Sequence, residues 1–226
     1  MVPAKDWRIR IERAHFLARK FPESAHLLEL YARIAEIQEW IATGPAKDLR
    51  VCFEKLRMLP LPEPLASYPL TERLLEEEPS TPEAKFFTRV LLQPRLETNR
   101  PPVSARENGL CPSCGEKPVA GVLRGEGDGA KRGLICSLCA LEWPYRRLIC
   151  PNCGEEDKEK LPVYKAVQIE HVRVEACETC RTYIKSVDLT KDGLAVPVVD
   201  EIATVVLNLW ADQRGYVKVE TNLLGM

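Results

Sequence analysis

Paired cysteines are the feature that most constrains how this chain can fold. Of its nine cysteines, eight fall between Cys111 and Cys180, and each of the eight belongs to a C-x-x-C pair. A C-x-x-C turn can direct both sulfurs at one ion, and two such turns separated by a short loop complete a tetrahedral thiolate site. The eight candidate metal ligands are Cys111, Cys114, Cys136, Cys139, Cys150, Cys153, Cys177 and Cys180.

These pairs form a repeat. Between the inner cysteines of each half lie 21 residues (Cys114 to Cys136) and 23 residues (Cys153 to Cys177). Each half opens with C-P-x-C-G and closes with a plain C-x-x-C, at offsets of 39 and 41 residues, which indicates one small unit used twice. The glycine after the second cysteine suits a positive φ. Pairing neighbouring turns closes the shorter loops, whereas pairing the first turn with the third and the second with the fourth stays open.

Other uses of paired cysteines fit less well. Structural disulfides would need an oxidising compartment, yet the stretch from Met1 to Lys20 has no apolar segment of a signal peptide. A thioredoxin-like redox pair would need a βαβ context, which these motifs lack. No apolar run is long enough to span a bilayer. We therefore expect reduced, metal-binding cysteines in a soluble, cytoplasmic protein without membrane insertion.

Composition argues against a nucleic-acid partner. The formal net charge is −1, and the basic and acidic residues number 16 and 15 up to Ser104 and 16 and 18 thereafter. Small cysteine ribbons that bind nucleic acid generally show a basic excess, and none is visible here. With 45 % hydrophobic residues, the chain can bury a core.

The part before the cysteines reads as helical. Apolar residues recur at helical spacing over 6–20 and 22–41, a third helix is expected over 46–58, and Thr81 with Pro82 starts another that runs to about Arg95. Cys52 reads as a buried apolar residue and His15 and His26 as exposed helix residues. No catalytic signature is present, so this part is expected to be a scaffold or a docking surface.

The cysteine region reads as short strands that end in a helix. Two hairpins, 119–124 with 133–135 and 162–170 with 172–176, would deliver the second cysteine turn of each half, with His171 structural. A last helix is expected over 200–214 with Ile202, Val205, Val206 and Leu209 facing inward, and the tail 217–226 is expected on the surface. The fold class is α+β: a helical N-terminal domain, two tandem four-cysteine modules and a C-terminal helix.

Prolines mark the expected division of the chain. The run Arg100-Pro101-Pro102 separates the helices from the cysteines. We predict a helical domain over 1–104, a first four-cysteine module over 105–148, and a second module with the C-terminal helix over 149–226.

Beyond the metal spacing, the chain resembles the formate dehydrogenase accessory protein FdhE family between Leu110 and Gly225. The matching segments read CPSCGEKPVAG, CSLCALEWPYRRLICPNCG, VEACETCRTYIKSVD, DEIATVVLNLWADQRGY and NLLG. They include residues that generic cysteine ribbons do not share: Glu142, Trp143, Arg147, Glu175, Thr182, Tyr183 and Lys185.

This resemblance implies rubredoxin-like modules in a cytoplasmic assembly factor without enzymatic activity. Its partner would be the catalytic subunit of a respiratory formate dehydrogenase, and homo-oligomerisation stays open. The resemblance favours iron, while four thiolates accept zinc equally well. Two other functions stay open: a rubredoxin-like electron carrier and a nucleic-acid-binding zinc ribbon. The pairs Glu142–Trp143 and Thr182–Tyr183 follow cysteine turns and could face a partner or pack between the modules.

Overall fold

Helices form the first part of the molecule, as the periodicity predicts. The computed structural model describes residues 7–43, 45–99, 101–104 and 109–226. Asp6, Gly44 and Arg100, which the sequence predictions include, lie outside these residues. The helices of this part are α1 (Trp7–Lys20), η1 (Pro22–Ser24), α2 (Ala25–Ala42), α3 (Leu49–Arg57), η2 (Glu72–Leu75) and α4 (Pro82–Thr98).

One apolar core joins these helices. Each helix buries one stripe, and α4 starts at Thr81, whose hydroxyl accepts a hydrogen bond from the Ala84 amide at 3.1 Å. Cys52 is fully buried in this core, and His15 and His26 are exposed, as predicted. The Arg10 guanidinium bonds the Glu97 carboxylate at 2.8 and 3.0 Å and links α1 to α4. Side chains at the centre of the core include Leu17, Leu28, Ile34, Leu56, Phe87 and Leu91.

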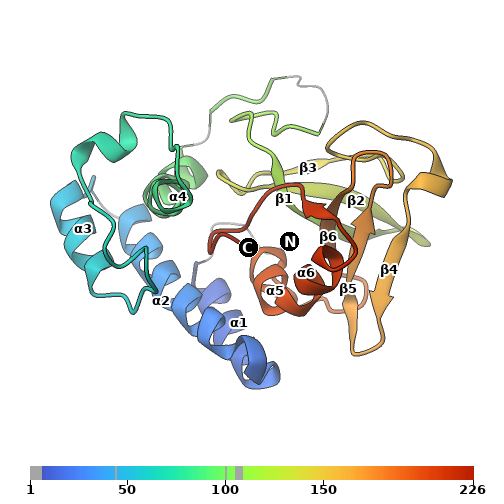
Figure 1. The fold of residues 1–226 in the computed structure, drawn as a ribbon, viewed down its shortest axis with the longest axis horizontal. Coiled ribbons are helices and arrows are strands. Elements are labelled where there is room, and N and C mark those ends of the chain that lie inside the picture. Colours follow the sequence, from blue (N-terminus) through green and yellow to red (C-terminus); the bar gives the residue numbers. More distant parts are fainter. Residues whose placement is uncertain (1–6, 44, 100, 105–108) are drawn as a thin grey trace.

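A mixed sheet forms the second part of the molecule, and Figure 1 shows it beside the helices. The strands follow the order β3-β2-β1-β6-β5-β4, and β7 pairs with β6. Both predicted hairpins are present, as β1 with β2 and as β4 with β5. The strands are β1 (Pro118–Glu126), β2 (Gly129–Cys136), β3 (Glu142–Pro144), β4 (Val163–Ala166), β5 (Ile169–Ala176), β6 (Thr182–Asp188) and β7 (Val217–Lys218), with η3 (Lys158–Lys160) before β4.

Parallel pairing between β1 and β6 joins the two cysteine units into one sheet. In this pairing Gly121 lies opposite Ser186, and a Cβ atom at Gly121 would lie 2.1 Å from the Ser186 hydroxyl oxygen. Glycine is therefore required for the two strands to approach this closely. The predicted boundary between the two modules, at 148/149, is thus crossed by sheet hydrogen bonds. The boundary at 104/105 adjoins residues outside the described ranges, so the three-part division stays a prediction.

The C-terminal helical segment differs from the prediction. Two helices, α5 (Pro197–Ala203) and α6 (Val205–Asp212), replace a single one, because Thr204 leaves helical geometry at φ −100° and ψ 38°. The break changes which side of the segment is buried. Ile202 is buried, as predicted, whereas Val206 and Leu209 are 45 % and 60 % exposed, so the prediction that these two face inward is wrong.

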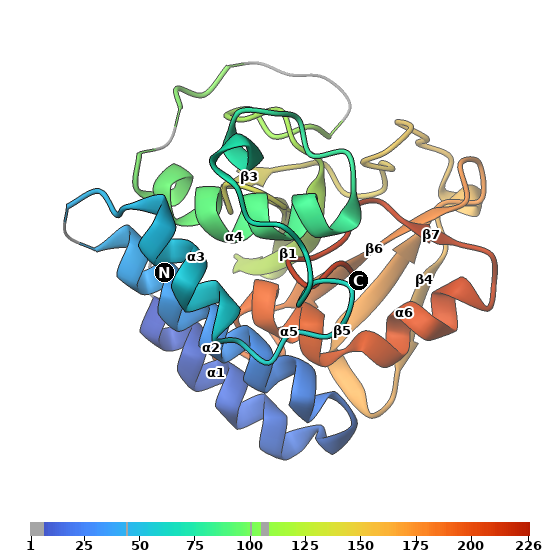
Figure 2. The ribbon, with the colours of Figure 1, turned by 60° about the vertical axis from the view of Figure 1, so that its left-hand side comes forward.

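Helix α5 connects the two parts of the fold. Val199, Ile202 and Ala203 of α5 belong to the helical core, while Lys185 of β6 reaches the same helix from the sheet. In Figure 2, α5 lies beside α1 and α2. Within the described residues, no helix combines the length and apolar character needed to cross a bilayer.

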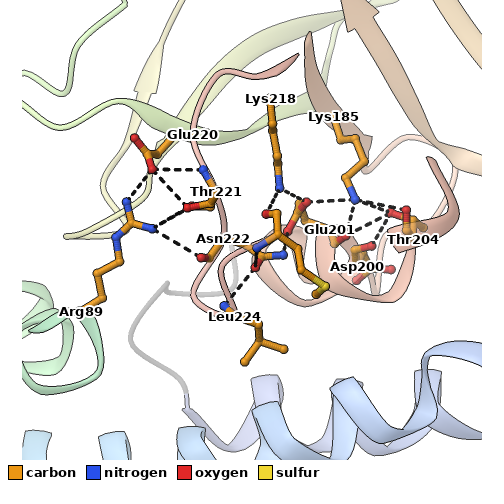
Figure 3. Close-up of polar contacts among 11 residues, drawn as sticks. Arg89, Lys185, Asp200, Glu201, Thr204, Lys218, Glu220, Thr221, Asn222 and Leu224 are labelled. Carbon is orange, nitrogen blue, oxygen red and sulfur yellow. Dashed lines mark hydrogen bonds and ion pairs between the residues drawn. The ribbon is translucent and has the colours of Figure 1, made fainter. Parts of the chain in front are cut away.

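The tail after β7 runs through the interior, and its predicted surface position is wrong in part. Val219, Asn222 and Leu223 are buried, and Figure 3 shows the polar contacts that hold this segment. The fully buried Glu201 carboxylate pairs with Lys185 at 2.9 Å, pairs with Lys218, and accepts a hydrogen bond from Asn222 at 2.7 Å. These charged and polar side chains can be buried because they pair with one another through ion pairs and hydrogen bonds.

The charges of this buried network are held in place by their neighbours. Burial would raise the pKa of Glu201, but Lys185 and Lys218 lower it to about 2. Arg89 of α4 pairs with Glu220 at 2.8 Å, which fixes the tail to the helical part as well.

Candidate metal centres

The first quartet of sulfurs forms where the loop before β1 meets the end of β2. Cys111 lies 3.5 Å from Cys139, and Cys114 lies 3.3 Å from Cys136 and 3.6 Å from Cys139, measured between Sγ atoms. The Gly115 amide donates to the Cys111 carbonyl at 2.9 Å, and Gly115 has φ +86°, as predicted for the glycine after the turn. In the second turn, the Cys139 amide donates to the Cys136 sulfur at 3.4 Å.

The second quartet repeats this geometry beside the start of β6, the strand that runs parallel to β1. Cys150 lies 3.7 Å from Cys180, and Cys153 lies 3.7 Å from Cys177. Gly154 has φ +78° and donates its amide to the Cys150 carbonyl at 3.0 Å, as Gly115 does in the first unit.

Sequence reasoning missed a feature shared by the two closing turns. Ala140 and Arg181, the residues directly after Cys139 and Cys180, have φ of 50° and 55°, a region that favours glycine. Arg181 is held there by its own contacts: it donates to the Arg214 carbonyl at 2.5 Å, and its guanidinium lies 4.1 Å from the Tyr216 ring centroid. The missing glycine is the reason that the sequence gives no signal for this turn.

Neighbouring turns pair in both units, and the crossed arrangement does not occur. In each quartet the four sulfurs lie within 4.8 Å of one another, and all nine cysteines are free thiols. Sulfurs placed tetrahedrally at the usual zinc–sulfur bond length of about 2.3 Å would be about 3.8 Å apart. Five of the sulfur pairs lie 3.3–3.7 Å apart and all lie within 4.8 Å, which is close to the spacing of a four-thiolate site.

Comparison with known proteins matches this architecture. A model of the FdhE central domain matches residues 110–147, and a model of the FdhE C-terminal domain matches residues 148–224. Together they cover the whole cysteine region and the tail. The chain belongs to the FdhE family.

Relatives of this family extend the match and set its limits. An FdhE homolog of Aquifex aeolicus is 37 % identical over 69 % of this chain and 57 % of its own length. An FdhE homolog of Pseudomonas aeruginosa is 35 % identical over 54 % of this chain and 41 % of its own length. The chain thus spans about half the length of these curated relatives. The crystal structure of the FdhE protein from Pseudomonas aeruginosa shares the fold, with a TM-score of 0.71 at 24 % identity over 98 % of this chain and 95 % of that chain.

The two quartets of this FdhE chain differ in their surroundings. The first is enclosed by apolar side chains, among them Leu134, Trp143 and Ile184, and three of its four cysteines are buried. In the second quartet Cys153 is exposed and Cys180 is half-buried.

Crowding of the sulfurs changes their acidity. In the first quartet, hydrogen bonds from neighbouring thiols lower the pKa of Cys111, whereas contact with Cys111 raises the pKa of Cys136 and Cys139. The pKa of Cys114 is lowered as well, so Cys111 and Cys114 become more acidic while Cys136 and Cys139 hold their protons more tightly. A metal ion would displace those protons, because the thiolate is the form that binds.

Most other residues that the sequence singled out have packing roles. Trp143 and Tyr183 are buried, and Glu142 pairs with Arg124 at 2.7 Å. The Thr182 hydroxyl lies 3.0 Å from the Cys180 sulfur.

His171 is part of a third group of potential ligands, with Asp192 and Asp200. Its Nε2 atom lies 2.9 Å from the Asp200 carboxylate. Arg13 already pairs with both carboxylates, at 2.6 Å with Asp192 and 2.5 Å with Asp200. Both carboxylates are therefore already occupied by Arg13, and Asp200 also accepts a hydrogen bond from the Val196 amide at 2.7 Å, so this group is an internal ion-pair network and His171 is structural.

Proposed function

We propose that this FdhE chain is an assembly factor, without enzymatic activity, that binds the catalytic subunit of a respiratory formate dehydrogenase in the cytoplasm. Family membership supports the proposal, together with the resemblance of residues 110–225 to formate dehydrogenase accessory proteins. The observation that carries it is the pair of cysteine quartets built into one sheet, which offers a rigid surface to a partner.

We propose further that the eight cysteines hold two metal ions. Iron is favoured by the family resemblance, and zinc suits the same four sulfurs. Each cysteine unit is too short to build a core alone, so metal binding would contribute to its folding free energy. The sulfur spacing described above supports this role.

Co-purification tests the proposal directly. The chain and a formate dehydrogenase catalytic subunit are co-expressed, the complex is recovered through a tag on the chain, and metal content is measured in the same sample. We expect the wild-type chain to recover the subunit and Cys136→Ser to lose both an ion and the subunit. Cys52→Ser is the matched control, because Cys52 is also a buried thiol but lies outside both quartets. Recovery of the subunit by a chain without metal would contradict the proposal.

Exposure of Cys153 favours one second candidate, electron transfer at the second centre. Electron exchange with a partner requires a centre near the surface, and Cys153 is the exposed sulfur of the two quartets. This function predicts iron, visible charge-transfer absorption and reversible reduction that turns over a partner. A colourless zinc protein with full assembly activity would exclude it.

A further inference from the structure

A cavity lies between the two cysteine units on the face of the sheet turned away from α6. Its volume is about 300 Å³, and its lining includes Cys150 and Cys177 of the second quartet. Alternate residues of a strand face opposite sides of a sheet. Val172 and Val174 of β5 pack with Leu207 of α6, so Arg173 and Glu175 lie on the other face, where they line the cavity.

Positive charge dominates the cavity. Its lining holds four cationic side chains, Arg132, Arg147, Lys165 and Arg173, and one carboxylate, Glu175. Glu175 is already engaged, with Arg132 at 2.7 Å and Arg173 at 2.6 Å. A divalent ion in the second quartet would leave that centre at −2, so the five side chains at +3 still give a positive balance.

Two of these cations have no partner of their own. The side chains of Arg147 and Lys165 are exposed and make no ion pair or hydrogen bond within the described part of the chain. Arg132 contributes positive charge from within the wall: its side chain is 3 % exposed, and its guanidinium is held by Glu175 at 2.7 Å and by the Arg146 carbonyl at 3.2 Å.

The positive region is longer than one small ion needs. A second hollow of about 550 Å³ shares Arg132 and Arg147 with the first and adds Lys131 and Arg146. The walls of the first cavity also carry apolar side chains, among them Leu161, Ile184 and the 43 % exposed Val163. An extended ligand that alternates acidic and apolar groups would use both kinds of lining.

Other anions suit this lining less well. Phosphate sites generally use amides at a helix N-terminus or in a glycine-rich loop, and no helix or glycine contributes to the described lining of either hollow. Single-stranded nucleic acid requires aromatic rings free for base stacking. Here Tyr183 is buried, and the Tyr145 ring is already in contact with Arg132, whose guanidinium lies 5.4 Å from the ring centroid.

We propose that the two hollows bind an acidic polypeptide segment in which apolar residues adjoin the carboxylates. Carboxylates would meet Arg147 and Lys165, and apolar side chains would enter beside Val163. The inference goes beyond the proposed function, since it holds for any polypeptide partner and does not depend on a formate dehydrogenase subunit.

Fluorescence anisotropy with labelled octapeptide pools tests the site on the full, metal-loaded chain. One pool alternates Asp or Glu with Leu, Ile, Val or Phe, and the other replaces the acids by Lys or Arg. We expect the acidic pool alone to bind, more weakly as salt rises. Arg147→Glu with Lys165→Glu should reduce its affinity at least tenfold, and Val163→Ser several-fold. Arg19→Glu with Arg33→Glu is the charge-matched control on exposed helix residues, with unchanged affinity expected.

Several results would overturn the inference. These are no binding of the acidic pool at millimolar concentration, equal loss in the control variant, or displacement of the pool by inorganic phosphate at low millimolar concentration. Thermal unfolding of each variant verifies the fold. Binding of the pool without recovery of a formate dehydrogenase subunit would count against the proposed function and leave this site standing.

Discussion

The two cysteine quartets share one design and differ in what surrounds them. Both close with the same amide–carbonyl bonds and the same positive φ after the second cysteine of each turn. The first quartet is packed against Leu134 and Trp143, while the second exposes Cys153 and borders a cationic cavity. The two units therefore share ligand geometry but differ in enclosure: the first quartet is covered by apolar side chains, and the second has an exposed sulfur.

Position in the sheet explains this difference. The first quartet lies where the end of β2 meets α4 and the tail, so Leu96 and Val219 cover it. The second lies beyond β5, in the half of the sheet that ends at the edge strand β4, and Cys153 is exposed there. The comparison predicts unequal effects of equal substitutions.

Loss of a ligand in the first quartet should have the largest effect. We expect Cys136→Ser to release one ion and to lower the melting temperature by more than about 10 °C, because structural sites of this kind contribute several kcal/mol to folding. Calorimetry with metal analysis measures both. The control Cys52→Ser should keep both ions. A Cys136→Ser variant with the melting temperature of the wild type would contradict the structural role assigned to the first quartet.

Removal of the apolar cover of the first quartet comes next. Trp143 is 9 % exposed, and Trp143→Ala should lower the free energy of unfolding by about 3–5 kcal/mol through lost burial and a cavity. Val163→Ala, at the 43 % exposed wall beside the second quartet, should change it by less than about 0.5 kcal/mol. Urea denaturation measures the free energy of unfolding of both variants. Similar losses in the two would show that the quartets are equally enclosed.

A ligand change in the second quartet should have a smaller effect on stability. We expect Cys153→Ser to release one ion while the melting temperature falls by less than half as much as in Cys136→Ser, since Cys153 is exposed. In the wild type, a chelator should remove the second ion faster than the first. Simultaneous release of both ions would show that the two centres behave as one cooperative unit.

Loss of an ion pair between the two cysteine units should have the smallest effect on stability. Burial would raise the pKa of Glu175, but Arg132 and Arg173 lower it below the usual value. Glu175 therefore stabilises the fold at neutral pH, and this contribution disappears as pH falls through the lowered pKa. Glu175→Gln should cost about 1–2 kcal/mol near pH 7. The difference from the wild type should shrink on acidification in urea titrations, and a constant difference would contradict the ionised pair.

Local patterns carried most of what the sequence could predict. Spacing gave the two quartets, because a C-x-x-C turn is fixed by its own few residues, and helical periodicity gave α1, α2 and α4. The parallel pairing of β1 with β6 was not predictable, since residues 65 positions apart along the chain, Gly121 and Ser186, meet without any local signal. The same applies to the buried tail, whose Lys218 and Asn222 are inside because Glu201 is there to receive them.

Helix α6 shows where periodicity itself misled. The apolar residues of 200–214 continue in helical register through Thr204, so one helix was expected. The break at Thr204 exposes Val206 and Leu209, and Trp210 packs on Tyr164 with ring centroids 4.7 Å apart. Tertiary contacts of this kind override a pattern read along the chain.

Native mass spectrometry of the chain purified under reducing conditions tests the central claim most directly. Eight sulfurs arranged in two preformed quartets should yield a chain that carries two metal ions, each identified as iron or zinc by its mass. A mass equal to that of the metal-free chain, or one lowered by disulfide formation among these cysteines, would contradict the account.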